Sequence, residues 1–276
     1  MAGSSLWITR HLIYSKKSRK DTKTQIFIFS RFYGNLRRMR LQFIVCKVMQ
    51  KEAYYCAARS PNTVDVVVMK QGLHNEPEKL RREVQKALDS TTDTQNRPYD
   101  ASLLGYGLCS NGIIGLSAKI PMVVPRGHDC VTLLLGSKDT YKDYFDSHRG
   151  VYWFSPGWIE TDMQPGKERF ERTLKEYIEK FGEDNARYLI ETEQSWMKEY
   201  DWATYIDWGF ANNEREKQFT KKAAQYLNWK YDEVKGDSGL MRRLVDGRWD
   251  EKDFLIVKPG QKIGEDLTDA GIIKAE

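Results

Sequence analysis

Short apolar runs rich in β-branched residues recur along this 276-residue chain and restrict the folds open to it. The two clearest, residues 41–48 and 64–69, are apolar over most of their length, as is typical of strands buried on both faces of a parallel sheet. The same reasoning predicts further strands at residues 99–106, 121–124, 151–154, 203–208 and 254–257.

Helical patterns separate these runs. An amphipathic helix is predicted from Pro77 to about Ser90, and shorter helices at residues 113–118, 131–135, 141–145, 213–228 and 240–244. Residues 166–200 are helical in pattern with a break at Gly182 and are interpreted as an insertion. Strands that alternate with helices pair in parallel. The sequence therefore predicts an α/β fold with an open, mainly parallel sheet flanked by helices and a helical insertion after residue 165.

Charge is distributed unevenly. The chain carries a net charge of +5, but the first 40 residues hold ten Lys or Arg against one acid, Asp21, so the remainder carries −4. We therefore expect a basic extension at residues 1–40, either disordered or upstream of a true start at Met39, and a single α/β domain at 41–276. A slightly acidic body argues against nucleic acid or a membrane surface as a partner.

The hydropathy and the cysteine content together indicate where in the cell the protein is found. No apolar run reaches 18 residues, so no membrane-spanning helix is expected. Four cysteines in a chain of this size do not form a disulfide framework, and no secretory segment precedes them. We expect a cytoplasmic protein with reduced thiols.

The cysteines and histidines follow the predicted strands. Cys46 lies near the end of the first, Cys109 just after the third, and His128 with Cys130 after the fourth, while His74 follows the second. Ligands of an open parallel sheet bind outside the carboxyl ends of its strands. Successive crossovers should therefore bring these side chains to one sheet edge, and a helix start at Cys109 and at Cys130 should lower their thiol pKa.

Two metal centres fit this pattern. Zinc would take Cys109, His128 and Cys130, with Cys46 able to complete the set, and an iron–sulfur cluster would take Cys46, Cys109 and Cys130 with one iron open. Asp129 and His74 are candidates for orienting a ligand or exchanging protons. Packing is as good an explanation for Cys46, because buried cysteine often acts as a small hydrophobe.

Two alternatives need no metal. The glycine-rich turn at residues 105–112 resembles a phosphate-binding turn, in which Gly107 and Asn111 would contact an anion that Arg126 neutralises. A Cys109–Cys130 pair would support thiol redox chemistry if the two sulfurs lie within bridging distance.

Several phrases of the sequence are similar to a known family. They are LGYGLCSNG at residues 104–112, PRGHDC at 125–130, LLLGS at 133–137, SPGW at 155–158 and LHNEP at 73–77. Over residues 41–263 the chain resembles prokaryotic domain-of-unknown-function family 1638, whose members are often found beside corrinoid-dependent methyltransferases. The resemblance implies a link to methyl-group metabolism. The spacing of His128 and Cys130 also resembles the zinc pair of methyltransferases related to uroporphyrinogen decarboxylase, although their third, downstream cysteine is absent here.

These observations lead to one expected function and its rivals. We expect a metal-binding protein, with zinc or an iron–sulfur cluster, acting as an enzyme on a small-molecule thiol or methyl-group substrate in corrinoid-linked one-carbon metabolism. A non-catalytic metal or cofactor carrier for a methyltransferase system is the alternative, and a thiol redox protein is a third.

Overall fold

The computed structural model describes residues 38–210, 213–266 and 272–276. The chain divides into two compact units, Met1–Arg38 and Met39–Glu276, and every described helix and strand lies in the second. The expectations for the extension at residues 1–40 thus fall almost wholly outside the described residues.

A five-stranded sheet forms the centre of the larger unit. Its strands run in the order β2 (Thr63–Met69), β1 (Arg40–Cys46), β3 (Ala101–Gly105), β4 (Met122–Pro125) and β8 (Phe254–Val257). The first four are parallel, and β8 pairs antiparallel with β4. All residues of β3 and β4 are buried, which explains why Ser102 is their single polar side chain. The predicted α/β class with a mainly parallel open sheet is confirmed.

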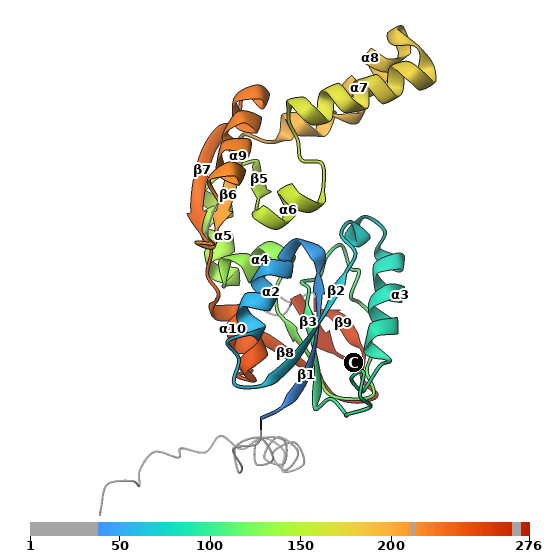
Figure 1. Cartoon of the computed structure of the whole chain (residues 1–276), viewed down its shortest axis with the longest axis vertical. Helices are drawn as coiled ribbons and strands as arrows, with labels where there is room; N and C mark the ends of the chain where they lie inside the picture. The colour runs from blue at the N-terminus through green and yellow to red at the C-terminus, as the bar shows by residue number, and fades with distance from the viewer. Residues whose placement is uncertain (1–37, 211–212, 267–271) are drawn as a thin grey trace, which may run out of the picture. The chain divides into compact units, whose positions relative to one another are not determined.

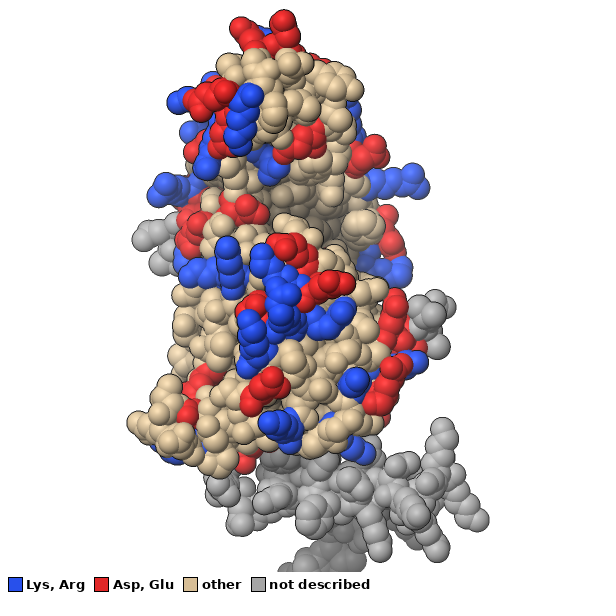
Figure 2. Space-filling model, turned by 90° about the vertical axis from the view of Figure 1, so that its right-hand side faces the viewer, with Lys and Arg blue, Asp and Glu red and all other residues tan. Residues whose placement is uncertain are grey.

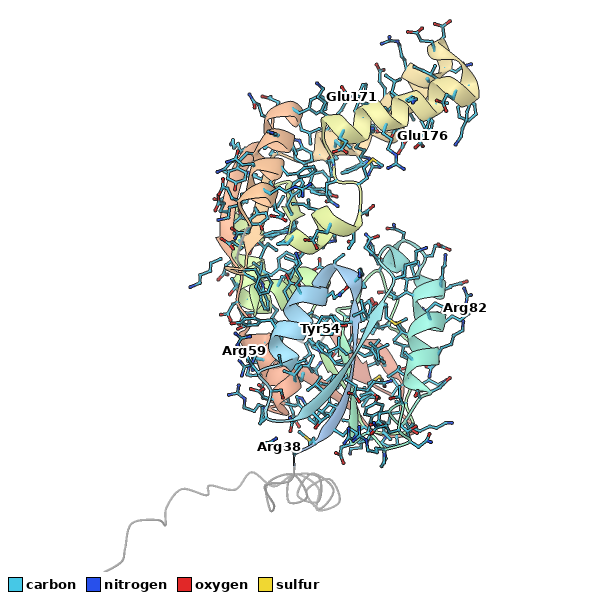
Figure 3. The ribbon with its side chains drawn as sticks, viewed as in Figure 1. Arg38, Tyr54, Arg59, Arg82, Glu171 and Glu176 are labelled. Carbon is cyan, nitrogen blue, oxygen red and sulfur yellow. The ribbon has the colours of Figure 1, made fainter. Side chains whose placement is uncertain are left out.

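Helices cover both faces of this sheet (Figure 1). Helices α2 (Gln50–Ala57) and α10 (Gly239–Asp246) pack together on one face, and α3 (Pro77–Leu88) lies on the other. Helix α3 buries Leu80, Val84 and Leu88 at helical spacing, and its Arg82 points into solvent (Figure 3).

A second parallel sheet, which we did not expect, contains β5 (Val151–Phe154), β6 (Trp202–Asp207) and β7 (Lys230–Lys235). Helix α9 (Glu214–Leu227) packs on β6 and β7. Helix α5 (Lys138–Ser147) is held to the same strands by the Tyr144 hydroxyl, which donates to Asp232 at 2.7 Å. The sequence does not indicate β7, because four of its six residues are charged and none is fully buried.

The helical insertion is confirmed as a hairpin of α7 (Lys167–Phe181) and α8 (Glu183–Glu193), followed by the short η3 (Ser195–Glu199). Gly182 separates the two helices with a φ of 80°. Helix α7 buries no residue completely, and its Glu171 and Glu176 project from the hairpin (Figure 3).

The helix predicted at residues 113–118 is wrong. The segment is a series of turns, with Gly115 at a φ of 85°. Besides the local bonds of these turns, its backbone bonds to β9 (Ile263–Asp266), since the Gly115 N–H donates to the Ile263 carbonyl at 2.7 Å. Strand β9 pairs antiparallel with β10 (Ile272–Ala275).

No helix within the described ranges combines the length and the apolar character that a membrane span requires.

Candidate functional site

A cavity of about 420 Å³ lies at the carboxyl ends of β1, β3 and β4, where strand β5 and helix α6 (Pro156–Thr161) close over it. This is the position at which open α/β sheets bind their ligands. Its volume is in the range of small-molecule sites. We call this cavity, with the side chains around it, the thiol pocket.

Three free cysteines line the thiol pocket, each from a different crossover. Cys46 is the last residue of β1, Cys109 lies in the loop after β3, and Cys130 is the first residue of helix α4 (Cys130–Leu135). The fold therefore brings these three side chains together at one edge of the sheet, as the sequence predicted. Cys56, the fourth cysteine, is buried on α2 and does not line the pocket.

Backbone hydrogen bonds join the loops that carry Cys109 and Cys130. The Leu108 N–H donates to the Gly127 carbonyl at 2.8 Å, and the Cys109 N–H donates to the His128 carbonyl at 2.9 Å. The two loops therefore form a short ladder beyond the ends of β3 and β4. This ladder fixes where Cys109 lies relative to Cys130.

The turn at Cys109 is conformationally strained. Cys109, Ser110 and Asn111 have φ values of 47°, 55° and 62°, a region that residues other than glycine adopt at a cost of about 1 kcal/mol each. Strained backbone of this kind persists where the surroundings hold it, and it clusters at functional sites. The cost is offset here by the loop ladder and by the Gly112 N–H, which donates to the Cys109 carbonyl at 3.0 Å.

The thiols are protonated at neutral pH. Burial, followed by the nearby Asp129 and Cys46, raises the pKa of Cys109 to about 12, against backbone N–H groups that lower it. Burial, followed by Cys109 and Asp129, raises the pKa of Cys130 well above its ordinary value. Burial also raises the pKa of Cys46.

The expectation that helix starts would lower these thiol pKa values is thus wrong. Cys109 lies in a turn, not at the start of a helix, and Cys130 opens a helix of only six residues. Removal of water around a thiolate outweighs the dipole of so short a helix. The mutual effects on pKa also indicate that the three sulfurs lie close enough to interact.

Tyr106 lies among the three cysteines. Burial raises the pKa of its phenol, and negative charge on Cys46, Cys109 or Cys130 would raise it further. The hydroxyl lies beside the Cys46 thiol, but it has no hydrogen-bond partner of good geometry. A buried hydroxyl without a partner costs free energy, so this oxygen is available to a group bound in the pocket.

Asp129, His74 and His128 also line the thiol pocket, as the sequence predicted for this sheet edge. Asp129 caps α4 by accepting from the Val131 N–H at 2.9 Å, and it accepts from the Tyr141 hydroxyl at 2.9 Å. Burial raises the pKa of its carboxyl. His74 lies in the short η2 (Leu73–Asn75), half-buried, whereas His128 is exposed.

The residues of the possible phosphate turn lie elsewhere or serve packing. Arg126 does not line the pocket, and its guanidinium donates to the carbonyls of Glu251 at 3.1 Å and Ile273 at 2.5 Å. Asn111 is exposed, and its carbonyl accepts from Arg81 at 3.1 Å. Gly107 packs against the backbone of Asp129 and does not line the pocket.

Sequence reasoning missed Tyr106 and underrated the aromatic residues of the pocket. Tyr152 and Trp153 of β5, Trp158 of α6, and Tyr200 line the thiol pocket. The sequence of the run at residues 152–158 predicts a strand but no site, because strand periodicity alone does not reveal that a cavity borders β5. The density of aromatic residues in that run was the available signal.

The described residues contain no group of three or more His, Cys, Asp or Glu side chains already arranged around a single metal ion. Bonds of about 2.3 Å to a tetrahedral zinc put the ligand sulfurs roughly 4 Å apart. The three thiols therefore line one pocket without being spaced for a mononuclear site.

Comparison with known proteins identifies a family for this chain. A family profile described as "Protein of unknown function (DUF1638)" matches residues 68–245, well over half of the chain. The chain belongs to this family. No curated protein and no solved structure matches it. The matched range includes Cys109, His128 and Cys130, whereas Cys46 precedes it.

Proposed function

We propose that the thiol pocket holds an iron–sulfur cluster on Cys46, Cys109 and Cys130, with one iron open to the cavity. The observation that carries the proposal is the meeting of three free thiols, which follow the neighbouring strands β1, β3 and β4, around one buried hydroxyl without a partner. Cysteine thiolates are the usual ligands of such clusters.

The protonated state of the three thiols is consistent with a metal centre that displaces their protons when it binds. Buried thiols with raised pKa values stay neutral until a positive group enters, and metal binding then displaces their protons. A cluster is preferred to a single zinc ion, because it takes the three pocket thiols as its ligands, whereas the predicted zinc set also needs His128, which is exposed. The Tyr106 hydroxyl would donate to a cluster or thiolate sulfur, which would give it the partner that it lacks.

The cavity supports turnover more than storage. A volume of about 420 Å³ leaves room beside three thiol ligands, and half-buried His74 borders that space. We infer that the protein is an enzyme whose open iron acts as a Lewis acid on a small thiol or methyl-group substrate, in keeping with the corrinoid-linked metabolism that the family resemblance implies. His74 and Asp129 are then the candidates for proton exchange with that substrate.

Anaerobic purification with quantification of iron, acid-labile sulfide and zinc tests the centre. We expect about four iron and four sulfide per chain, the stoichiometry of a [4Fe–4S] cluster, with the corresponding visible absorption. The variants Cys46→Ser, Cys109→Ser and Cys130→Ser should each lose most of it.

Cys56→Ser is the matched control, since Cys56 is a free, fully buried cysteine that does not line the pocket. It should retain the full iron content. Iron that is unaffected by the three pocket substitutions would overturn the assignment. One zinc per chain, lost in Cys109→Ala, Cys130→Ala and His128→Ala, would replace it with the zinc centre.

A further inference from the structure

One wall of the thiol pocket is aromatic. Tyr152 and Trp153 come from β5, Trp158 from α6, and Tyr200 from the segment after η3. The rings of Tyr152 and Tyr200 meet edge to face, with centroids 5.4 Å apart. Four half-buried aromatic side chains from three segments therefore border the same cavity as the thiols.

Within the part of the chain that the structure describes, the lining of the pocket carries an acidic side chain but no Lys or Arg. No Lys or Arg is among its described lining residues, and Asp129 is the single carboxylate among them. A phosphate or carboxylate ligand would enter without a countercharge, which is costly in a partly desolvated cavity. On the face that carries α3, the surface is hollowed beneath the α7–α8 hairpin, and the visible wall of that hollow is mostly uncharged (Figure 2).

Aromatic faces attract cations electrostatically, most strongly for tryptophan. The aromatic cluster behind the pocket already carries one such contact, since the Arg169 guanidinium lies 5.9 Å from the Trp196 ring centre. Trp196 in turn packs on Tyr152 and Tyr200 at 5.9 and 5.6 Å. Arg169 is paired with Glu193 at 3.4 Å, so its charge is balanced locally.

Few acceptors remain free for an ammonium group that carries N–H bonds. Both carboxylate oxygens of Asp129 are in use, one by the Val131 N–H and the other by the Tyr141 hydroxyl. A primary ammonium would lose hydration without regaining a hydrogen bond from a free carboxylate, whereas a quaternary ammonium has no N–H to satisfy. The lining thus favours a fully methylated cation.

We propose that the aromatic wall of the thiol pocket binds a small quaternary ammonium group, seated on Trp158 and its aromatic neighbours and facing the thiols. This inference adds a ligand class to the pocket, and it stands on aromatic residues that the metal centre does not use, so that Asp129 is the residue that both proposals share. The cation requires aromatic faces and a carboxylate, both of which are present whether or not a cluster is bound.

An isosteric series tests the proposal by isothermal titration calorimetry on the full chain. Choline, 3,3-dimethylbutan-1-ol and 3,3-dimethylbutanoate share a trimethyl head and differ in charge. We expect choline to bind at least tenfold more tightly than the neutral alcohol, and the anion to bind least. Equal binding of choline and the alcohol, or no binding of choline, would overturn the proposal.

Variants locate the binding surface. Trp158→Leu removes an aromatic face and should weaken choline binding at least fivefold, whereas Trp158→Phe should recover part of the loss. Tyr188→Leu is the control, since Tyr188 is 72% exposed on α8 and does not line the pocket. Loss of choline binding in Tyr188→Leu, or none in Trp158→Leu, would contradict the assignment.

One experiment tests the proposed cation site independently of the proposed metal centre. Choline is titrated into Cys109→Ser, prepared without metal, as well as into the protein as purified. Binding retained in the metal-free variant supports the aromatic site even if no cluster is found. A loss confined to that variant would show that the cation contacts the metal centre and not the aromatic wall, which would overturn the inference.

Discussion

Gly107 lies so close to Asp129 that a β-carbon at position 107 would sit 2.5 Å from the Asp129 amide nitrogen. This contact joins the loop after β3 to the loop after β4, beside the ladder that connects Cys109 to His128. Gly107→Ala should push the two loops apart and destabilise the protein by about 1–3 kcal/mol, the usual cost of overpacking. Chemical denaturation followed by circular dichroism measures the change.

Gly209→Ala provides the comparison. Gly209 has a φ of 69° and nothing within 4 Å of an added β-carbon, so this substitution costs backbone strain without a clash. We expect a smaller loss of about 1 kcal/mol and unchanged iron content. If Gly107→Ala keeps both its stability and its iron, the two loops do not position the centre as described.

Replacement of Tyr106 by Phe should have opposite effects on the empty and the occupied protein. Without metal, the variant loses a buried hydroxyl that has no good partner, so the free energy of unfolding should rise or stay within about 1 kcal/mol. With a cluster bound, the variant lacks a hydrogen-bond donor to sulfur and should release iron to a chelator faster. A metal-free Tyr106→Phe that is destabilised by more than 2 kcal/mol would mean that the hydroxyl already has a strong partner.

Thiol alkylation should report the raised pKa values. With a pKa of about 12, Cys109 of the metal-free protein is almost wholly protonated at pH 8, so iodoacetamide should label it at least 100-fold more slowly than a cysteine in an unstructured peptide. The rate should rise about tenfold per pH unit up to about pH 11 while the fold persists. Mass spectrometry of the labelled peptide follows it, and a plateau below pH 9 would refute the burial argument.

The sequence allowed the strands of the central sheet to be predicted because each contains a short apolar run, although β2 carries Asp65 and buries no residue fully. Strand β7 was not predicted because four of its six residues are charged, and only its pairing with β6 makes it a strand. The division of the strands into two sheets depends on long-range packing, which local periodicity does not contain. The same holds for residues 113–118, whose turns are held by hydrogen bonds to β9.

For the site, the rule that ligands gather at the carboxyl ends of parallel strands predicted that Cys46, Cys109 and Cys130 would meet. Their pKa values could not be predicted in this way, since burial depends on what covers the loops, here β5 and α6. Tyr106 was overlooked for a related reason. It ends an apolar run like any core residue, and only the folded protein shows its hydroxyl between thiols.

Gly157 fixes helix α6 against the end of β1, and its substitution should disturb the aromatic wall. A β-carbon at position 157 would overlap the Val48 carbonyl oxygen, so Gly157→Ala must move α6, and Trp158 with it, away from the short helix η1 (Lys47–Met49). We expect choline affinity to fall at least fivefold while helix and strand content persists. Unchanged choline affinity in a folded Gly157→Ala protein would separate Trp158 from the binding surface.

Glu52 gives the protein a pH-dependent stability that is independent of the thiol pocket. Its carboxyl is 1% exposed on α2, and neither oxygen has a hydrogen-bond partner. Burial raises its pKa to about 7, and Glu160 contributes to the rise while Lys51 opposes it.

A carboxyl whose pKa is raised by folding stabilises the fold fully below its unfolded pKa of about 4.3, and the contribution is lost as pH rises through about 7. The wild-type free energy of unfolding should therefore fall by on the order of 3 kcal/mol between pH 5 and pH 8 relative to Glu52→Gln, which does not titrate. Urea denaturation of both proteins across this range measures the difference, and parallel pH profiles would mean that Glu52 has partners in solution that keep it ionised.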